Sequence, residues 1–139
     1  ILYHGPRNDL PPFYCPKKVI PILSELKDYI TAVRGNCDAE VDQMVLPFNI
    51  LEERKIVEID GKRILLHHGH HETDTSGFSV VMSGHTHVPV LEEKDGILYL
   101  NPGSTTIPKN GSTPSYAVWD DGRISIIGLD DGHIVKEWK

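Results

Sequence analysis

The sequence predicts an α/β fold in which one helix and one buried strand are followed by a strand-rich remainder. An amphipathic segment, a short apolar segment and a polar loop containing glycine follow one another between residues 16 and 38, which is the order helix, strand, loop. Beyond residue 54, short apolar segments alternate with Asp-Gly pairs, a pattern that favours antiparallel hairpins. With 139 residues and 39% hydrophobic residues, the chain suits a single globular domain spanning residues 1–139.

The N-terminal part begins with a loop, because residues 1–15 are rich in Pro, Gly, Asn and Asp. Apolar residues then recur at helical spacing over Pro16–Asp28, with a proline in the first turn, which predicts one amphipathic helix. Tyr29–Val33 is typical of a buried strand, and it leads directly into the polar segment Arg34–Asp38. Active sites of α/β proteins gather at the carboxyl ends of strands, so this segment is a candidate functional loop.

The C-terminal half is predicted to be a run of antiparallel strands. Lys55–Ile59 and Arg63–His67 flank Asp60-Gly61, which is the signal for a hairpin with a type I′ turn. The other predicted strands are Phe78–Met82, Val88–Glu92, Ile97–Leu100, Tyr116–Trp119, Arg123–Leu129 and His133–Trp138. Further Asp-Gly pairs separate several of these segments.

Composition excludes several classes of protein. The 14 Lys and Arg residues against 20 Asp and Glu residues give a net charge of −6, which argues against a general nucleic-acid binder. No apolar run approaches the roughly 20 residues that span a bilayer. Two cysteines, Cys15 and Cys37, cannot form a disulfide framework and fit the reducing cytoplasm.

Three loops that follow apolar segments carry residue types that bind metals: Gly35–Asp38, His67–His70 and Gly84–His87. Six of the eight histidines fall within 21 residues. At the end of a strand, residues i and i+2 point to the same face, so both histidines of the last loop could approach one centre. Imidazole and amide ligands suit Mn, Zn or Fe(II) better than Ca or Mg, so we expect a transition-metal site.

These three loops, in this order, resemble the later motifs of the calcineurin-like metallophosphoesterases. The stretch His4–Asn8, together with Asn101–Ser104 and Pro108-Lys109, resembles the YfcE-like bacterial phosphodiesterases within that superfamily. The resemblance implies a two-sheet α-β-β-α sandwich and a hydrolase with two divalent metal ions. Mn is the first expectation for these ions, and Zn, Fe or Ni also fit the ligands. In such a centre, a hydroxide held between the ions attacks phosphorus in line.

The resemblance also assigns roles to individual residues. Asn36, His68 and His85 would bind one ion, and His87 would bind the other. The implied catalytic residues are Asn36, Cys37 and His68, and the implied substrate-binding residues are Arg7, Asn8 and Arg34. The commoner motif has a histidine at the position of Cys37, whereas the YfcE-like branch has cysteine. A thiol is a poor acid for protonating an alkoxide, so we expect a preference for diesters with good leaving groups.

Neighbouring residues receive supporting roles from the same resemblance. His67 and His70 would orient ligands or the phosphate, whereas His71 is expected to be a surface residue. Asp38 would orient a ligand or cap a turn, and Arg34 would contact phosphate or form a structural ion pair. The residues expected to hold the shape of the loop around Gly103 are Asn101 and Ser104.

Two departures from the family pattern shape the expectation for activity. The family's Asp-x-His and Gly-Asp motifs, which supply metal-binding carboxylates, would precede Ile1. The sequence therefore predicts an N-terminally truncated form of a longer enzyme, lacking the first β-α-β segment, with little or no activity and an exposed apolar helix face. The segment 70–83 is also shorter than the family pattern, through a trimmed helix or through missing residues.

Three function classes follow from these observations. The first is a metal-dependent phosphodiesterase that acts on a small phosphodiester rather than on long nucleic acid or at a membrane. The second is a non-catalytic scaffold, since the same fold serves the eukaryotic retromer coat with eroded metal ligands. The third is a simple zinc- or nickel-binding protein built on His67–His71, which leaves the other motif loops unexplained. The retained ligands favour the enzyme, and an uncovered sheet would favour a homo-oligomer.

Overall fold

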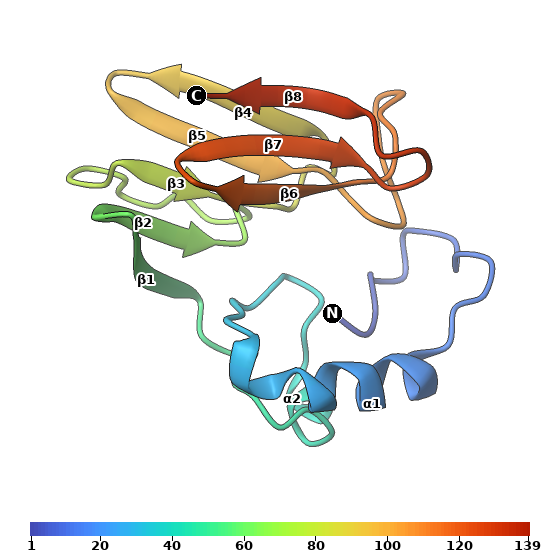
Figure 1. The fold of residues 1–139 in the computed structure, drawn as a ribbon. Coiled ribbons are helices and arrows are strands. Elements are labelled where there is room, and N and C mark those ends of the chain that lie inside the picture. Colours follow the sequence, from blue (N-terminus) through green and yellow to red (C-terminus); the bar gives the residue numbers. More distant parts are fainter.

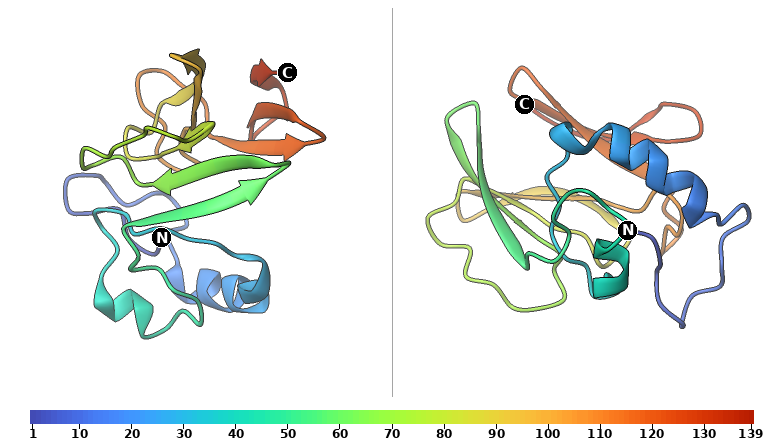
Figure 2. Two further views of the ribbon diagram at one scale, coloured as in Figure 1. Left: turned by 90° about the vertical axis from the view of Figure 1, so that its left-hand side faces the viewer. Right: turned by 90° about the horizontal axis from the view of Figure 1, so that it is seen from below.

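The computed structural model describes residues 1–139 and contains two β-sheets with two short helices on one side of them (Figures 1 and 2). The larger sheet has the strand order β1-β2-β3-β5-β4, and the smaller sheet has the order β6-β7-β8. The strands of the larger sheet are β1 (Arg54–Ile59), β2 (Lys62–His67), β3 (Val80–Met82), β4 (Pro89–Lys94) and β5 (Ile97–Pro102). Those of the smaller sheet are β6 (Ser115–Asp120), β7 (Arg123–Gly128) and β8 (Ile134–Trp138). The two-sheet α/β architecture expected from the sequence is confirmed.

The predicted hairpins are confirmed, and their turns have the expected chemistry. Strands β1 and β2 pair antiparallel from Arg54 opposite His67 to Ile59 opposite Lys62. The two turn residues, Asp60 and Gly61, have φ angles of 52° and 70°, and two successive positive φ values define the type I′ turn. The same sign pattern occurs at Asp95-Gly96 and Asp121-Gly122.

The prediction of an entirely antiparallel C-terminal half is wrong for β3. This strand pairs parallel with β2, where Ile64 lies opposite Val80, and parallel with β5, where Val80 lies opposite Leu98. Residues 68–79 connect β2 to β3, and a connection of this length can return the chain in the same direction. Parallel pairing at β3 brings the carboxyl ends of β2 and β3 to one edge of the sheet.

The main hydrophobic core lies between the two sheets. Each sheet turns alternate apolar side chains inward, and in β7 Ile124 and Ile126 are fully buried, whereas Ser125 between them is only partly buried. The core residues are Ile64, Val80, Leu98, Leu100, Ile124 and Ile126. This core fixes the strand ends that lead into the histidine loops.

The N-terminal part packs more loosely. Its first helix, α1 (Pro16–Glu25), contains Pro21 and no buried residue, and it ends earlier than predicted, before the 3-10 turn η1 (Lys27–Tyr29). The expected exposure of the helix's apolar face is confirmed, because the exposed fractions of Val19, Ile22 and Leu26 are 39%, 58% and 48%. The buried residues of the small core in this part are Leu2, Leu46 and Ile50. No helix has the length and apolar character needed to cross a bilayer.

The strand predicted at Tyr29–Val33 does not form. The segment leaves η1 as extended chain that belongs to neither sheet, and the ring of Tyr29 is 89% exposed. The first backbone hydrogen bond beyond it joins the N–H of Arg34 to the carbonyl of Glu52, at 2.8 Å. A strand needs a hydrogen-bonded neighbour, and β-branched composition alone cannot supply one. After this segment, the short helix α2 (Glu40–Gln43) begins where the Asp42 carboxylate accepts the N–H of Ala39, at 3.2 Å.

Candidate active site

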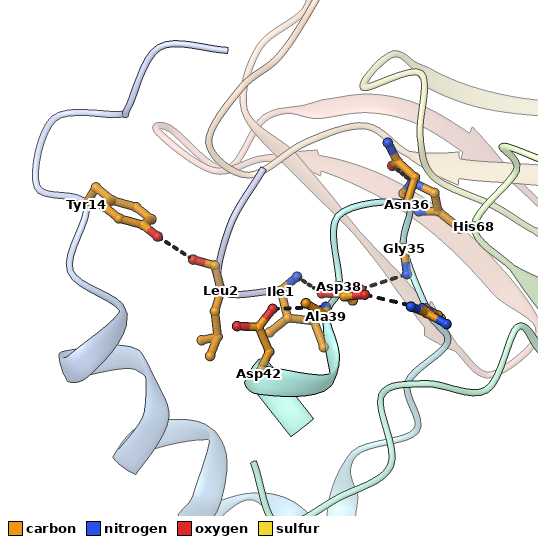
Figure 3. Close-up of polar contacts among 10 residues, drawn as sticks. Ile1, Leu2, Tyr14, Gly35, Asn36, Asp38, Ala39, Asp42 and His68 are labelled. Atoms are coloured by element: carbon orange, nitrogen blue, oxygen red, sulfur yellow. Dashed lines mark hydrogen bonds and ion pairs between the residues drawn. The ribbon is translucent and has the colours of Figure 1, made fainter. Parts of the chain in front are cut away.

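The loop Arg34–Asp38 is shaped by the buried carboxylate of Asp38, which is 6% exposed (Figure 3). One carboxylate oxygen accepts the N–H of Gly35 at 2.7 Å, and the other pairs with the amino group of Ile1. The guanidinium Nε of Arg34 donates to the Asp38 carbonyl at 3.2 Å. The bond from the Gly35 N–H to the carboxylate is the turn cap that was one of the two roles expected for Asp38.

Asn36 and His68 meet across this loop. The Nε2–H of His68, just beyond the end of β2, donates to Oδ1 of Asn36 at 2.8 Å (Figure 3). Gly35 permits this approach, because a Cβ at its position would lie 3.0 Å from the Asp38 carboxylate and 3.4 Å from the His68 ring. Two residues that are 32 positions apart are therefore brought together as the sequence predicted.

The imidazole of His68 is held in its neutral form. Burial, together with the nearby rings of His85 and His70, lowers the pKa of His68 to about 4. The ring centroids of His68 and His85 are 5.1 Å apart. A neutral imidazole is the form that binds a metal ion, so His68 is available as a ligand at neutral pH.

His85 and His87 follow β3 in an unusual backbone conformation. Their φ angles are 64° and 61°, in the left-handed region that residues other than glycine seldom adopt and that is associated with functional sites. The expectation that strand geometry would place the two rings on one face is wrong in its reason, since neither residue lies in β3. Both rings nevertheless line the same cavity.

The histidine loop is fixed by neighbours from β5 and the loop after it. The buried side chain of Asn101 donates to the carbonyl of Gly84 at 2.6 Å and to the Thr86 hydroxyl at 3.1 Å, and it accepts the N–H of Gly103 at 3.0 Å. The loop-shaping role expected for Asn101 is confirmed. Nδ1–H of His87 donates to the carbonyl of Ile107 at 2.8 Å, which leaves Nε2 of that ring as its acceptor nitrogen.

The predicted site residues converge on one cavity of about 1040 Å³. Of the residues proposed from the sequence, those that line it are Arg7, Asn8, Asn36, Cys37, His68, His85 and His87. Arg34 does not line it, and its guanidinium lies 3.8 Å from the carboxylate of Glu53 in an ion pair. This position matches the structural alternative considered for Arg34.

The stretch His4–Asn8 closes one wall of the cavity. Asn8 donates from its amide to the carbonyl of His4 at 3.0 Å, and the His4 ring contacts the carbonyl of Asp9 at 3.1 Å, so the loop is held by its own bonds. Gly5 gives room to Cys37, because a Cβ at Gly5 would lie 2.9 Å from the thiol sulfur. The thiol therefore lines the cavity within a closely packed wall.

Two residues for which the sequence suggested no role lie in or near the cavity. Lys109 lines the cavity, and its N–H donates to the carbonyl of His87 at 3.2 Å. The signal for it was the Pro-Lys pair within the stretch that carried the family resemblance. Glu53 lies near His70 and His71, and no sequence pattern links these positions.

The charge of the cavity differs from that of the whole chain. Asp38 is the only acidic residue among those that line it, whereas Arg7, Lys109 and several histidines also line it. The chain as a whole carries a net charge of −6. A locally basic cavity in an acidic protein favours a small anionic ligand over a long polyanion.

The donor set fits a divalent metal ion. Asn36, His68 and His85 offer an amide oxygen and two imidazoles close together, which suits a transition metal, and His87 offers a further imidazole from the same loop as His85. All four side chains are neutral ligands, and Oδ2 of Asp38 accepts the N–H of Gly35.

Comparison with known proteins identifies the family of this chain. The sequence profile of the calcineurin-like phosphoesterase superfamily domain matches residues 13–121. The chain is 42% identical over 142 residues to phosphodiesterase YfcE of Escherichia coli, covering 99% of this chain and 77% of that protein. The solved structure of YfcE, described as a phosphoesterase, superposes with a TM-score of 0.93 over 99% of this chain and 78% of that chain.

A second structural likeness concerns the fold alone. Vps29 of Entamoeba histolytica, solved with Zn²⁺, superposes with a TM-score of 0.52 at 21% identity, over 98% of this chain and 93% of that chain. The superfamily also implies divalent metal ions, in keeping with the ligands that surround the cavity. On the profile match, the YfcE identity and the shared fold, the chain belongs to the calcineurin-like phosphoesterase superfamily.

Proposed function

We propose that this protein is a metal-dependent phosphodiesterase acting on a small phosphodiester. The observation that carries the proposal is the convergence of Asn36, His68, His85 and His87 on a basic cavity. A relative that is 42% identical bears the name phosphodiesterase, which supports the same reaction class. A non-catalytic scaffold would have no need for these four side chains together.

The proposed site binds two divalent ions, with Mn²⁺ as the first candidate. Bound ions of this kind supply a hydroxide nucleophile and offset charge on the phosphoryl oxygens. Asn36, His68 and His85 are the proposed ligands of one ion, and His87 is the proposed ligand of the other. The hydrogen bond that His87 donates to the Ile107 carbonyl fixes the orientation of that ring and leaves Nε2 to bind the ion.

The remaining cavity residues act on the substrate in this proposal. Arg7 and Asn8 bind the phosphoryl oxygens from one wall, and Lys109 adds a positive charge from the loop after β5. Arg34 does not line the cavity, so in this proposal it has the structural role, through its ion pair with Glu53. Cys37 lies beside the position of the leaving group, and because a thiol protonates an alkoxide poorly, diesters with good leaving groups are the preferred substrates.

The test measures hydrolysis of bis(4-nitrophenyl) phosphate with Mn²⁺. We expect Mn²⁺-dependent turnover of this diester, because the bound ions supply the hydroxide nucleophile. Removal of the metal by a chelator should abolish the turnover, and added Mn²⁺ should restore it.

Two variants decide the proposal. His68→Ala should lower the rate by at least about 100-fold, because it removes a metal ligand. His133→Ala, which changes an exposed histidine far along the chain, should leave the rate unchanged. A protein that binds Mn²⁺ and still fails to hydrolyse the diester would contradict the proposal and favour a scaffold.

The proposal extends to location and assembly. Both cysteines, Cys15 and Cys37, are free thiols in the structure, which supports a reducing cytoplasmic environment. The exposed apolar face of α1 supports pairing with a second copy. Size-exclusion chromatography with light scattering tests that pairing, and a monomer at high concentration would contradict it.

A further inference from the structure

A second cluster of metal-binding side chains lies outside the cavity, at the open end of the β1-β2 hairpin. Glu53, His70 and His71 each offer one ligand atom, and these atoms lie within 4.8 Å of one another. None of the three residues lines the cavity. Glu53 directly precedes β1, and the two histidines follow closely on β2, so the pairing of Arg54 with His67 brings them together.

His70 shows an independent sign of a missing ligand. Its Nδ1 atom is buried and has no hydrogen-bond partner, which is the only such case among the buried side-chain nitrogen and oxygen atoms of the chain. Buried polar atoms in folded proteins almost always have a hydrogen-bond partner, so a buried atom without one indicates that a partner is missing. A metal ion can supply it, because an imidazole nitrogen that accepts no hydrogen bond is free to bind a cation.

The other two side chains can adapt to an ion. His71 packs beside His70 with ring centroids 4.0 Å apart, and it is exposed. The Glu53 carboxylate is exposed as well, and its contact with the guanidinium of Arg34 is long, at 3.8 Å. An exposed ion pair of that length contributes little stability, so the carboxylate can turn toward a cation at small cost.

We propose that Glu53, His70 and His71 bind a divalent transition-metal ion, Zn²⁺ by preference, at a site beside the cavity. The ring of His70 lies 5.2 Å from that of His68, between this cluster and the cavity ligands. Two imidazoles and one carboxylate form a set of zinc ligands that leaves a fourth position for water. Imidazole also ranks Zn²⁺ above Mn²⁺, which prefers oxygen ligands. His71 is exposed, as the sequence predicted, and the proposal adds a ligand role to that position.

The geometry requires a small rearrangement. With metal–nitrogen distances of about 2.0 to 2.1 Å, the corners of a tetrahedral zinc site are about 3.4 Å apart. The ligand atoms, now within 4.8 Å, must therefore draw closer by up to about 1.4 Å. Glu53 and His71 are exposed, so their side chains are free to rotate toward His70.

The experiment titrates the 139-residue protein with Co²⁺ and follows the visible absorption of tetrahedral cobalt, and it then measures Zn²⁺ affinity by calorimetry. The test variants are Glu53→Gln and His71→Ala, both at exposed positions where folding is expected to persist. The matched control is His133→Ala, because His133 is also an exposed histidine paired with a carboxylate, that of Asp131. A second control, His85→Ala, reports on the cavity.

The proposal predicts that Glu53→Gln and His71→Ala each weaken the tetrahedral Co²⁺ band and lower Zn²⁺ affinity by at least about tenfold. His133→Ala should keep both signals. His85→Ala removes a proposed ligand of the cavity ion, so it should lower the total metal bound but keep the part of the Co²⁺ band that Glu53→Gln and His71→Ala remove. Any other pattern overturns the proposal, including a signal that only His85→Ala removes. The outcome is independent of hydrolysis, so its failure and the failure of the proposed phosphodiesterase activity are distinguishable.

Discussion

The two regions of this chain differ in how well their apolar residues are buried. Residues 54–139 form two sheets that enclose a core of six residues, each 4% exposed or less. Residues 1–53 have a core of three buried residues, and the helix α1 buries no side chain at all. Hydrophobic stabilisation scales with the apolar area removed from water, so the free energy of unfolding is concentrated in the sheets.

The candidate active site joins these two unequal regions. His68, His85 and His87 stand on loops that leave β2 and β3, whereas Asn36 and Cys37 stand on a loop of the N-terminal part. The histidines are therefore positioned by the more stable region, and Asn36 depends on the turn around Asp38. Regions with few buried contacts open locally before the whole protein unfolds, so we expect the N-terminal wall of the cavity to open first.

The largest effect expected from a single change lies in the core between the sheets. Replacing Ile126, which is 0% exposed, by alanine should lower the free energy of unfolding by about 2 to 5 kcal/mol, because it leaves a cavity. Ile22→Ala on α1, where the side chain is 58% exposed, should change it by less than about 0.5 kcal/mol. Urea denaturation measures both, and equal losses would contradict the difference between the regions.

A somewhat smaller effect is expected at Asn101. The change Asn101→Ala removes three hydrogen bonds at a buried side chain and should cost about 2 to 4 kcal/mol, because buried partners are left unpaired. It should also weaken metal binding by about tenfold, since the loop carrying His85 loses its support. Thermal unfolding measures the loss of stability, and metal titration measures the loss of affinity. An unchanged metal affinity would show that the loop keeps its conformation without Asn101.

Two glycines with positive φ angles allow the cost of backbone strain to be compared with the cost of an added steric clash. Gly103 has a φ of 87°, and a Cβ there would lie 2.5 Å from the Ser115 hydroxyl, whereas Gly96, with a φ of 77°, has open space around it. Gly96→Ala should cost about 1 kcal/mol through backbone strain alone. Gly103→Ala should cost about 2 to 3 kcal/mol because the clash adds to the strain. Equal melting temperatures for the two variants would mean that Ser115 moves aside freely.

A smaller effect is expected at Gln43, the counterpart of Asn101 in the N-terminal part. Gln43 also makes three hydrogen bonds through its amide, at 2.8 to 3.0 Å, to the backbone of Leu46, Phe48 and Ile50. Its side chain is only partly buried, so water can replace those partners, and Gln43→Ala should cost about 1 kcal/mol. Calorimetry compares it with Asn101→Ala, and a larger loss at Gln43 would reverse the ranking of the two regions.

The parts of the fold that sequence predicted are those governed by local chemistry. Asp60-Gly61 defines a type I′ turn within four residues, so the β1-β2 hairpin and its register follow from neighbouring positions. The direction of β3 and the failed strand at Tyr29–Val33 depend on partners far along the chain. No property of those residues by themselves specifies such partners.

The candidate site also contains residues that local motifs predict and a residue that only the fold brings close. Asn36, His68, His85 and His87 were found because each lies in a short motif whose residue types bind metals. Their shared cavity confirms that the motifs converge. Glu53 could not be found in this way, since only the register of β1 and β2 places it near His70 and His71.

The count of Mn²⁺ ions bound per chain, measured by elemental analysis after loading and desalting, tests whether the cavity is the metal centre. We expect the wild-type chain to retain Mn²⁺ at the cavity and His68→Ala to lose it, whereas His71→Ala retains it. Asn36→Ala should lose it as well, because its amide oxygen meets His68 at 2.8 Å. The same count in wild type, His68→Ala and Asn36→Ala would show that the cavity is not the metal centre.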